Sequence, residues 1–187
     1  MRPRIYNISA AGPLYIAWGD VEPDRSEFAE LLERYGPGLY SFLLYRLGRR
    51  EDAEDAYAEV FMKAWQGWAS YQERGRVQAW LFTIAYRRVV DGARAAVHRA
   101  TVPLEGDAQS HESGPEREAE GGYARERIGA VLATLPAEQR DVFLMREYGG
   151  LSFKEIAEAA GCPLSTALAR MRYAVLKLRA SLGDLDA

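Results

Sequence analysis

Apolar residues recur every three or four positions through most of this chain, a spacing typical of amphipathic α-helices. The pattern predicts three helices before residue 100 and four shorter helices after residue 122. No segment alternates apolar and polar residues for long enough to predict a β-strand. The expected fold class is therefore all-α, with two small helical domains.

The first group of predicted helices is long and strongly one-sided. An apolar stripe covers residues 28–47, and we expect a break or kink at the Gly-Pro-Gly sequence of residues 36–38. The second predicted helix covers residues 51–68 and opens with acidic groups that suit a helix N-terminus. The third covers residues 77–96. Together these helices predict an N-terminal helical bundle.

The second group ends in a recognisable pair of short helices. Helices are predicted over residues 123–134 and 136–148, the second of which ends at a Gly-Gly pair. Residues 152–155 have the Ser-x-x-Glu form of a capping box and begin a helix that ends near Gly161. A last helix then runs to about Leu182. Two helices joined by a tight turn predict a helix-turn-helix, whose second helix would enter a DNA groove.

An acidic strip separates the two groups. Residues 101–122 contain six acidic residues and one basic residue, are poor in large apolar residues, and show no helical stripe. We interpret the strip as a flexible linker between domains at residues 25–100 and 123–187. Residues 1–24 form an N-terminal extension with no assigned structure or role.

Composition narrows the class of protein. The 187 residues are 48% hydrophobic and 27% charged, with a formal net charge of −3, which indicates a folded, soluble chain. No apolar run reaches the ~18 residues needed to cross a bilayer, so no membrane insertion is expected. A single cysteine, Cys162, and two histidines, His98 and His111, predict neither a disulfide framework nor a zinc site. These counts favour a reducing compartment, the cytoplasm.

The sequence offers no chemistry that would predict an enzyme. It contains no Gly-rich phosphate loop, no serine or cysteine paired with a nearby histidine, and no metal-ligand set, so no cofactor is expected. The acidic cluster of Asp52, Glu54 and Asp55 is better interpreted as complementing a helix dipole than as an acid–base pair.

The helix-turn-helix carries groups suited to DNA. Arg170 and Arg172 lie on its second helix and Lys154 on its first, while Ser165 and Thr166 lie near the start of the second, where they could reach phosphates or base edges. The alternative is that these cations form an ordinary solvated face.

The apolar residues of that second helix predict its buried face. They leave few polar side chains for base readout. The expected stripe consists of Leu164, Leu168, Met171, Val175 and Leu178.

The third predicted helix combines aromatic and basic side chains. Aromatic rings stack on unpaired bases while arginines hold the backbone. Trp80 falls on the apolar stripe and is expected in the core. Phe82 and Tyr86 fall off that stripe and are expected to be exposed. The basic residues here include Arg87, Arg88 and Arg94.

Three segments, in this order, resemble those of one family. Residues 50–65, REDAEDAYAEVFMKAW, resemble its core-polymerase-binding segment. Residues 77–95, VQAWLFTIAYRRVVDGARA, resemble the segment that melts and reads the minus-ten element. Residues 135–179 resemble the reader of the minus-thirty-five element. The chain thus resembles an extracytoplasmic-function (group IV) sigma factor, the specificity subunit of bacterial RNA polymerase.

The resemblance implies roles for particular residues. It implies a region two over residues 25–100, which binds core polymerase and the minus-ten strand, and a region four over residues 123–187, which binds duplex DNA upstream. The residues matching the polymerase-docking positions are Asp52, Asp55, Glu59 and Phe61. Those matching the minus-ten segment are Trp80, Arg87, Arg88, Asp91 and Arg94, and Tyr86 is assigned to the same DNA-binding surface. Those assigned to region four are Lys154, Ser165, Thr166, Arg170 and Arg172.

The chain departs from the family pattern at several positions. Ala58 replaces a usual glutamine in the core-binding motif, and Tyr86-Arg87 stands where the family usually has Arg-Asn. Three usual basic positions of the recognition helix are occupied by Leu168, Tyr173 and Val175. Fewer cations should weaken phosphate contacts and flatten their salt dependence.

The resemblance implies three partners: bacterial core RNA polymerase, promoter DNA (duplex upstream and single-stranded at the minus-ten element), and an anti-sigma factor. The depleted recognition helix keeps a second hypothesis open, a helical protein that binds polymerase or an anti-sigma factor without reading DNA. A third, a stand-alone helix-turn-helix repressor, leaves the region-two resemblance unexplained.

Overall fold

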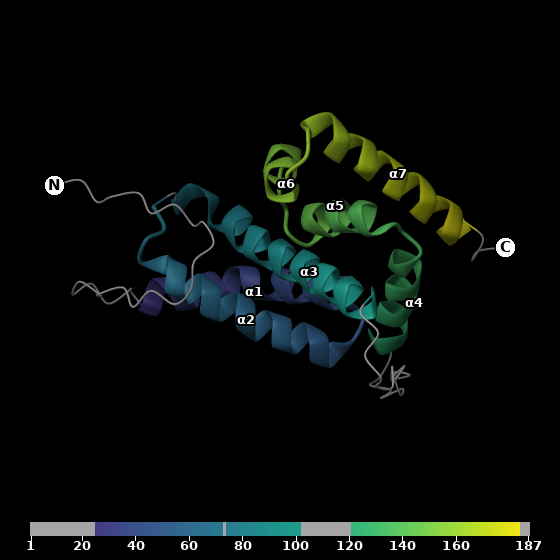
Figure 1. The fold of residues 1–187 in the computed structure, drawn as a ribbon. Helices are drawn as coiled ribbons and strands as arrows, with labels where there is room; N and C mark the ends of the chain where they lie inside the picture. The colour runs from purple at the N-terminus through teal and green to yellow at the C-terminus, as the bar shows by residue number, and fades with distance from the viewer. Residues whose placement is uncertain (1–24, 73, 102–120, 184–187) are drawn as a thin grey trace.

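The structure, a computed structural model, describes residues 25–72, 74–101 and 121–183. The predicted N-terminal extension and nearly all of the predicted acidic linker lie outside the described residues. The described part contains α-helices, one short 3₁₀ helix and no strand, which confirms the expected all-α class (Figure 1). The elements are α1 (Arg25–Leu47), α2 (Arg50–Trp68), η1 (Arg74–Arg76), α3 (Val77–Thr101), α4 (Gly121–Ala133), α5 (Ala137–Glu147), α6 (Phe153–Ala160) and α7 (Leu164–Gly183).

The sequence predicts a break or kink at residues 36–38, and the break is absent, because α1 continues through Pro37. Proline removes one backbone donor from a helix interior and normally disrupts it. Here the next turns place Leu39, Phe42 and Leu43 in the core with no exposed surface. Burial of three large side chains on one face outweighs the local penalty. Ser41 adds a side-chain bond, donating its hydroxyl to the Pro37 carbonyl at 2.9 Å.

Helices α1, α2 and α3 form the N-terminal unit. Small and branched residues of α2, such as Ala56 and Val60, are fully buried between the other two helices. At one end of the bundle the core is aromatic. Phe28 packs edge-on against Trp65 at 5.0 Å between ring centroids, and Trp80 stacks on Tyr71 at 4.6 Å. The amphipathic pattern of the sequence is satisfied by this three-helix packing.

Helices α4 to α7 form the C-terminal unit, and local signals determine its helix ends. Ser152 accepts a bond from the Glu155 backbone N–H, and the Glu155 carboxylate accepts from the Ser152 backbone N–H, which confirms the predicted capping box. Gly161 closes α6 in the left-handed conformation at φ 61°. Pro136 is the N-cap residue of α5, so this helix begins at Ala137, one residue later than the sequence predicts. The predicted helix-turn-helix is α6 and α7.

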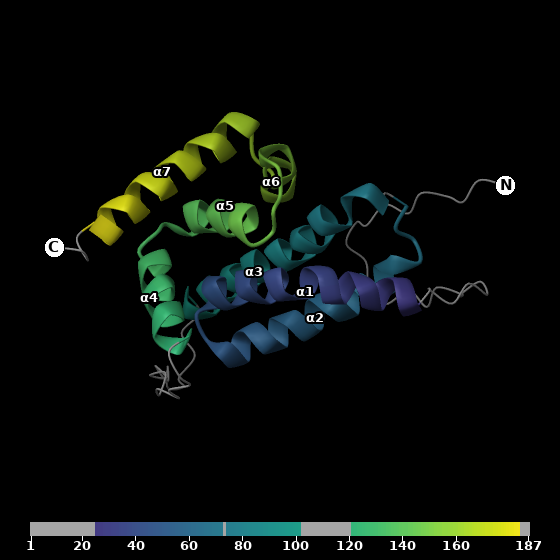
Figure 2. The ribbon, with the colours of Figure 1, turned by 180° about the vertical axis from the view of Figure 1, so that it is seen from behind.

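The two units pack against each other. Figures 1 and 2 show α5 and α6 lying over α1 and α3, with α2 on the far side of the N-terminal unit. Buried residues of both units belong to one continuous cluster, which includes Phe42 and Phe82 from the first and Leu144 and Leu151 from the second. Apolar packing therefore holds the two units in this relative position.

Replacing Ser152 with alanine is expected to lower the free energy of unfolding by about 1 kcal/mol, because the substitution removes one partner of the capping box. Bonds from Ser152, together with the nearby Arg76, lower the pKa of Glu155. The cap's contribution is therefore present at neutral pH and is lost as pH falls through the lowered pKa. Urea denaturation of Ser152→Ala at pH 7 and pH 4 measures both effects. Exposed Ser165→Ala serves as the control, and an equal loss in both variants would contradict the prediction.

Candidate nucleic-acid and partner interfaces

The acidic residues assigned to polymerase docking share one face of α2. Asp52, Asp55 and Glu59 are all exposed, and spacings of three and four residues place them on consecutive turns of the same face. Met62, 63% exposed, continues that face. An exposed row of carboxylates beside an apolar side chain suits a basic partner surface with an apolar component.

Phe61 does not join this acidic face. Its ring packs edge-on against Tyr57 at 4.3 Å between centroids and against Phe28 at 6.5 Å. The side chain is half-buried between α1 and α2. In this structure Phe61 therefore supports the helix that carries the acidic residues.

Glu59 and Arg88 form a salt bridge between α2 and α3. The Arg88 Nη2 donates to Glu59 Oε1 at 3.0 Å, and Nε donates to the other carboxylate oxygen. This bidentate pairing lowers the pKa of Glu59 and raises the pKa of Arg88. A residue assigned to polymerase and one assigned to DNA thus hold each other. The sequence gives no sign of this ion pair, because Glu59 and Arg88 are 29 residues apart in the chain.

Four of the residues matching the minus-ten segment lie along one free side of α3, and the last of them, Arg94, also borders the cleft between the two units. Arg87, Asp91 and Arg94 are exposed, and Arg94 lies 3.7 Å from Asp91. Trp80 lies on the same side about two turns before Arg87 and is partly buried against Tyr71. This side offers a partly exposed aromatic ring followed by cations, the combination that binds single-stranded nucleic acid.

The expected exposure of Phe82 is wrong. Only 1% of Phe82 is exposed, and its ring packs against Phe42 at 5.6 Å. Tyr86 is half-buried, and burial raises the pKa of its hydroxyl. Both residues lie off the apolar stripe of α3 because their side chains face the C-terminal unit. Periodicity within one helix does not distinguish a side facing solvent from a side facing a second unit.

The region-four candidates divide between two sides of the helix-turn-helix. Lys154, Ser165 and Arg172 are exposed, the last two on the outer face of α7. Thr166 and Arg170 are partly buried, and Arg170 faces the cleft between the two units. The structure therefore leaves Ser165 and Arg172 available on one face and turns Arg170 toward the N-terminal unit.

The stripe predicted to be buried on α7 is partly wrong. Leu164 and Leu168 are 49% and 45% exposed, whereas Ala167 and Ala174 are fully buried. Ala167 and Ala174 lie on the face of α7 that packs closely against α5 and α6. Alanine at positions seven residues apart was the available signal. Leu178 is buried as expected.

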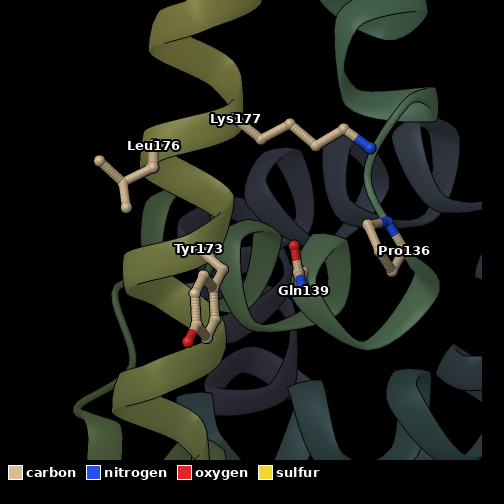
Figure 3. Close-up of a pocket in the computed structure, with 5 residues that line it drawn as sticks. All are labelled: Pro136, Gln139, Tyr173, Leu176 and Lys177. Atoms are coloured by element: carbon tan, nitrogen blue, oxygen red, sulfur yellow. The ribbon is translucent and has the colours of Figure 1, made fainter.

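The outer face of α7 consequently carries exposed apolar side chains. Tyr173 and Leu176 are 59% and 51% exposed. Figure 3 shows them beside a shallow groove that Pro136 and Gln139 also line. Lys177 extends across this groove and donates to the Thr134 carbonyl at 2.5 Å. We expect α7, with this surface, to contact fewer phosphates than a helix that is basic throughout.

Two family models match the chain and agree with this architecture. Sigma-70 region 2 matches residues 31–99, and Sigma-70 region 4 matches residues 125–178. These matches place the chain in the sigma-70 class of transcription initiation proteins. Within the described residues, no helix has the length and apolar character required of a membrane span.

Similar proteins narrow the class to one family. The ECF RNA polymerase sigma factor SigL of Mycobacterium tuberculosis is 31% identical over 156 residues, covering 83% of this chain and 88% of SigL. The ECF RNA polymerase sigma factor RpoE of Cereibacter sphaeroides is 29% identical over 163 residues, covering 83% and 86%. The chain belongs to the extracytoplasmic-function RNA polymerase sigma factors.

Two solved structures share the fold. The Bartonella quintana sigma factor RpoE, solved with the anti-sigma factor NepR, has a TM-score of 0.67 at 23% identity, covering 84% of this chain and 98% of that one. CnrH, solved with the cytosolic domain of CnrY, has a TM-score of 0.66 at 22% identity, covering 88% and 92%. Helices in both units of this chain thus follow a known fold.

Replacing Phe82 with alanine is expected to lower the free energy of unfolding by about 3–5 kcal/mol, because it opens a cavity in the core shared by both units. The matched variant Tyr173→Ala should cost less than about 0.5 kcal/mol, since its ring is exposed. Urea denaturation followed by circular dichroism compares the two. A Phe82→Ala variant as stable as Tyr173→Ala would show that the ring is not part of the core.

Proposed function

We propose that this sigma factor directs promoter-specific transcription initiation through three surfaces. The acidic face of α2 binds core RNA polymerase, the free side of α3 holds the unpaired minus-ten strand, and the outer face of α7 enters the groove at the minus-thirty-five element. The observation that carries this proposal is the grouping of acidic, aromatic–basic and helix-turn-helix surfaces on separate elements of one chain that belongs to this family.

The roles of the individual residues follow from their exposure. Asp52, Asp55 and Glu59 would meet basic groups of the polymerase, and Arg87 and Arg94 would hold the displaced strand beside Trp80. Because Arg88 already pairs with Glu59, polymerase contact at Glu59 would alter the neighbouring DNA-binding side. The polymerase itself performs nucleotide transfer, so these surfaces position and open the promoter.

Regulation by an anti-sigma factor is the second part of the proposal. The anti-sigma factor NepR forms a complex with a structurally similar sigma factor, RpoE of Bartonella quintana. The apolar surface of α7, which includes Leu168, Tyr173 and Leu176, supports such a partner here, because exposed apolar side chains favour protein contact over a phosphate backbone. An amphipathic helix with acidic flanks would complement these residues and the adjacent Arg172.

The decisive experiment is reconstitution with bacterial core RNA polymerase and run-off transcription from genomic fragments. Promoter-specific transcripts are expected. Asp55→Lys should weaken polymerase binding by about tenfold, because a cation replaces a carboxylate on the docking face. Glu33→Lys makes the same charge change on an exposed position of α1 and should bind normally. Equal binding by both variants would remove the α2 face from the proposal.

Arg172→Ala should weaken binding of the reconstituted holoenzyme to upstream duplex DNA and reduce the slope of log affinity against log salt by roughly one, because one phosphate contact is lost. Fluorescence anisotropy over a series of salt concentrations provides the measurement. Arg34→Ala, which removes an arginine next to Tyr35 on α1, is the control. An unchanged slope for Arg172→Ala would favour the alternative in which α7 binds a protein and reads no DNA.

A further inference from the structure

Helix α7 carries an exposed leucine among the residues that would meet DNA. Ser165, Leu168 and Arg172 are separated by three and four residues, so they lie along one side of α7 on successive turns. All three side chains are exposed, and Leu168 is 45% exposed. Ala167 and Ala174 mark the buried side of the same helix. The free side of α7 therefore presents a hydroxyl, then an apolar side chain, then a cation.

These residues occupy the part of a helix-turn-helix that reads bases. In this motif the first helix crosses the phosphate backbone, and the N-terminal residues of the second helix contact base edges in the major groove. At a rise of 1.5 Å per residue, the distance along α7 from Ser165 to Arg172 is about 10 Å, comparable to roughly three base pairs of B-DNA. Leu168 lies within that span, so it faces base edges when both of these neighbours contact DNA.

The cations near Leu168 suit a phosphate backbone. Lys154 of α6 and Arg172 of α7 are exposed, and in the described part of the chain neither forms an ion pair. Both can therefore contact phosphates, which hold a protein in register on DNA without reading its sequence. Ala169, exposed beside Leu168, adds no bulk that would keep the helix away from the bases.

Leucine restricts what α7 can read at this position. A single exposed leucine is ordinary on a protein surface, but Leu168 lies between Ser165 and Arg172 and would enter the major groove with them. Its side chain can neither bind a phosphate nor form a hydrogen bond with a base edge. Among the groups that base pairs present in the major groove, the C5-methyl group of thymine is the one suited to apolar contact. The chemistry of Leu168 therefore favours thymine.

We propose that Leu168 selects a thymine in the upstream promoter element by packing against its C5-methyl group, while Ser165 and Arg172 contact the DNA on either side. This inference rests on the proposed function and names the base that α7 selects. An apolar residue at a position that is usually basic exchanges a salt-dependent phosphate contact for discrimination among bases. Because Leu168 also belongs to the apolar surface offered to an anti-sigma factor, such a partner and DNA would compete for it.

Deoxyuridine tests this contact, because it differs from thymidine only in lacking the C5-methyl group. The probe is a labelled duplex of an upstream element mapped by run-off transcription, bound by core polymerase reconstituted with the full-length chain. Each thymine of the element is replaced in turn by deoxyuridine, and fluorescence anisotropy gives the dissociation constants. At one position the wild type should bind the deoxyuridine duplex about three- to fourfold more weakly, the effect of losing one buried methyl group.

Three variants identify the side chain responsible. Leu168→Ala should bind the thymine duplex more weakly than the wild type and should bind the thymine and deoxyuridine duplexes equally. Ile128→Ala is the matched control, because Ile128 of α4 is an aliphatic side chain with 44% exposure, and it should keep the wild-type preference. Leu168→Lys should also lose the preference for thymine, while the slope of log affinity against log salt steepens by roughly one, because a cation contacts a phosphate instead.

The outcomes separate the thymine contact from the proposed function. If the wild type initiates from specific promoters but no deoxyuridine substitution weakens its binding, the thymine contact is overturned and the function stands. A wild-type preference for thymine in Leu168→Ala overturns the contact in the same way. If the chain neither binds core polymerase nor directs specific transcripts, the function fails and the thymine contact fails with it.

Discussion

Close packing of α1 and α3 against the turn after α5 determines how the two helical units lie. Phe82 fills the space beside Phe42, and a Cβ at Gly149 would lie 2.9 Å from the Phe82 ring. A Cβ at Gly38 would likewise meet the chain at Tyr148. Because both glycines lack a side chain, backbone and ring approach closely enough to join two small cores into one.

Some charged residues form ion pairs that hold the helices together, and others remain exposed on the candidate interaction surfaces. Arg46 and Asp141 form a buried ion pair between the two units, and Arg88 and Glu59 form an ion pair between α2 and α3. Arg87, Asp91 and Arg172 stay on the surface. The net charge of −3 conceals this division, because the interaction surfaces depend on which charges are exposed and not on their sum.

Local signals in the sequence were enough for most of the helices. The Ser152–Glu155 capping box and the left-handed Gly161 depend on neighbouring residues, and both are found where the pattern predicts them. The predicted break at Pro37 fails because the apolar burial that follows it is a tertiary effect. Leu168 was placed in the core for a similar reason, since apolar periodicity alone does not show that Ala167 and Ala174 make the close contact.

The sequence by itself determined the helical class, the order of the elements and the three segments that resemble a sigma factor, because these depend on periodicity, capping and motif spacing along the chain. The tertiary structure decided which sides of those helices remain available. Phe82 and Tyr86 turn toward the second unit, and Arg46 finds Asp141 ninety-five residues away. Contacts between residues so distant in the chain leave no periodic trace, because each helix repeats its own pattern independently of the partner it packs against.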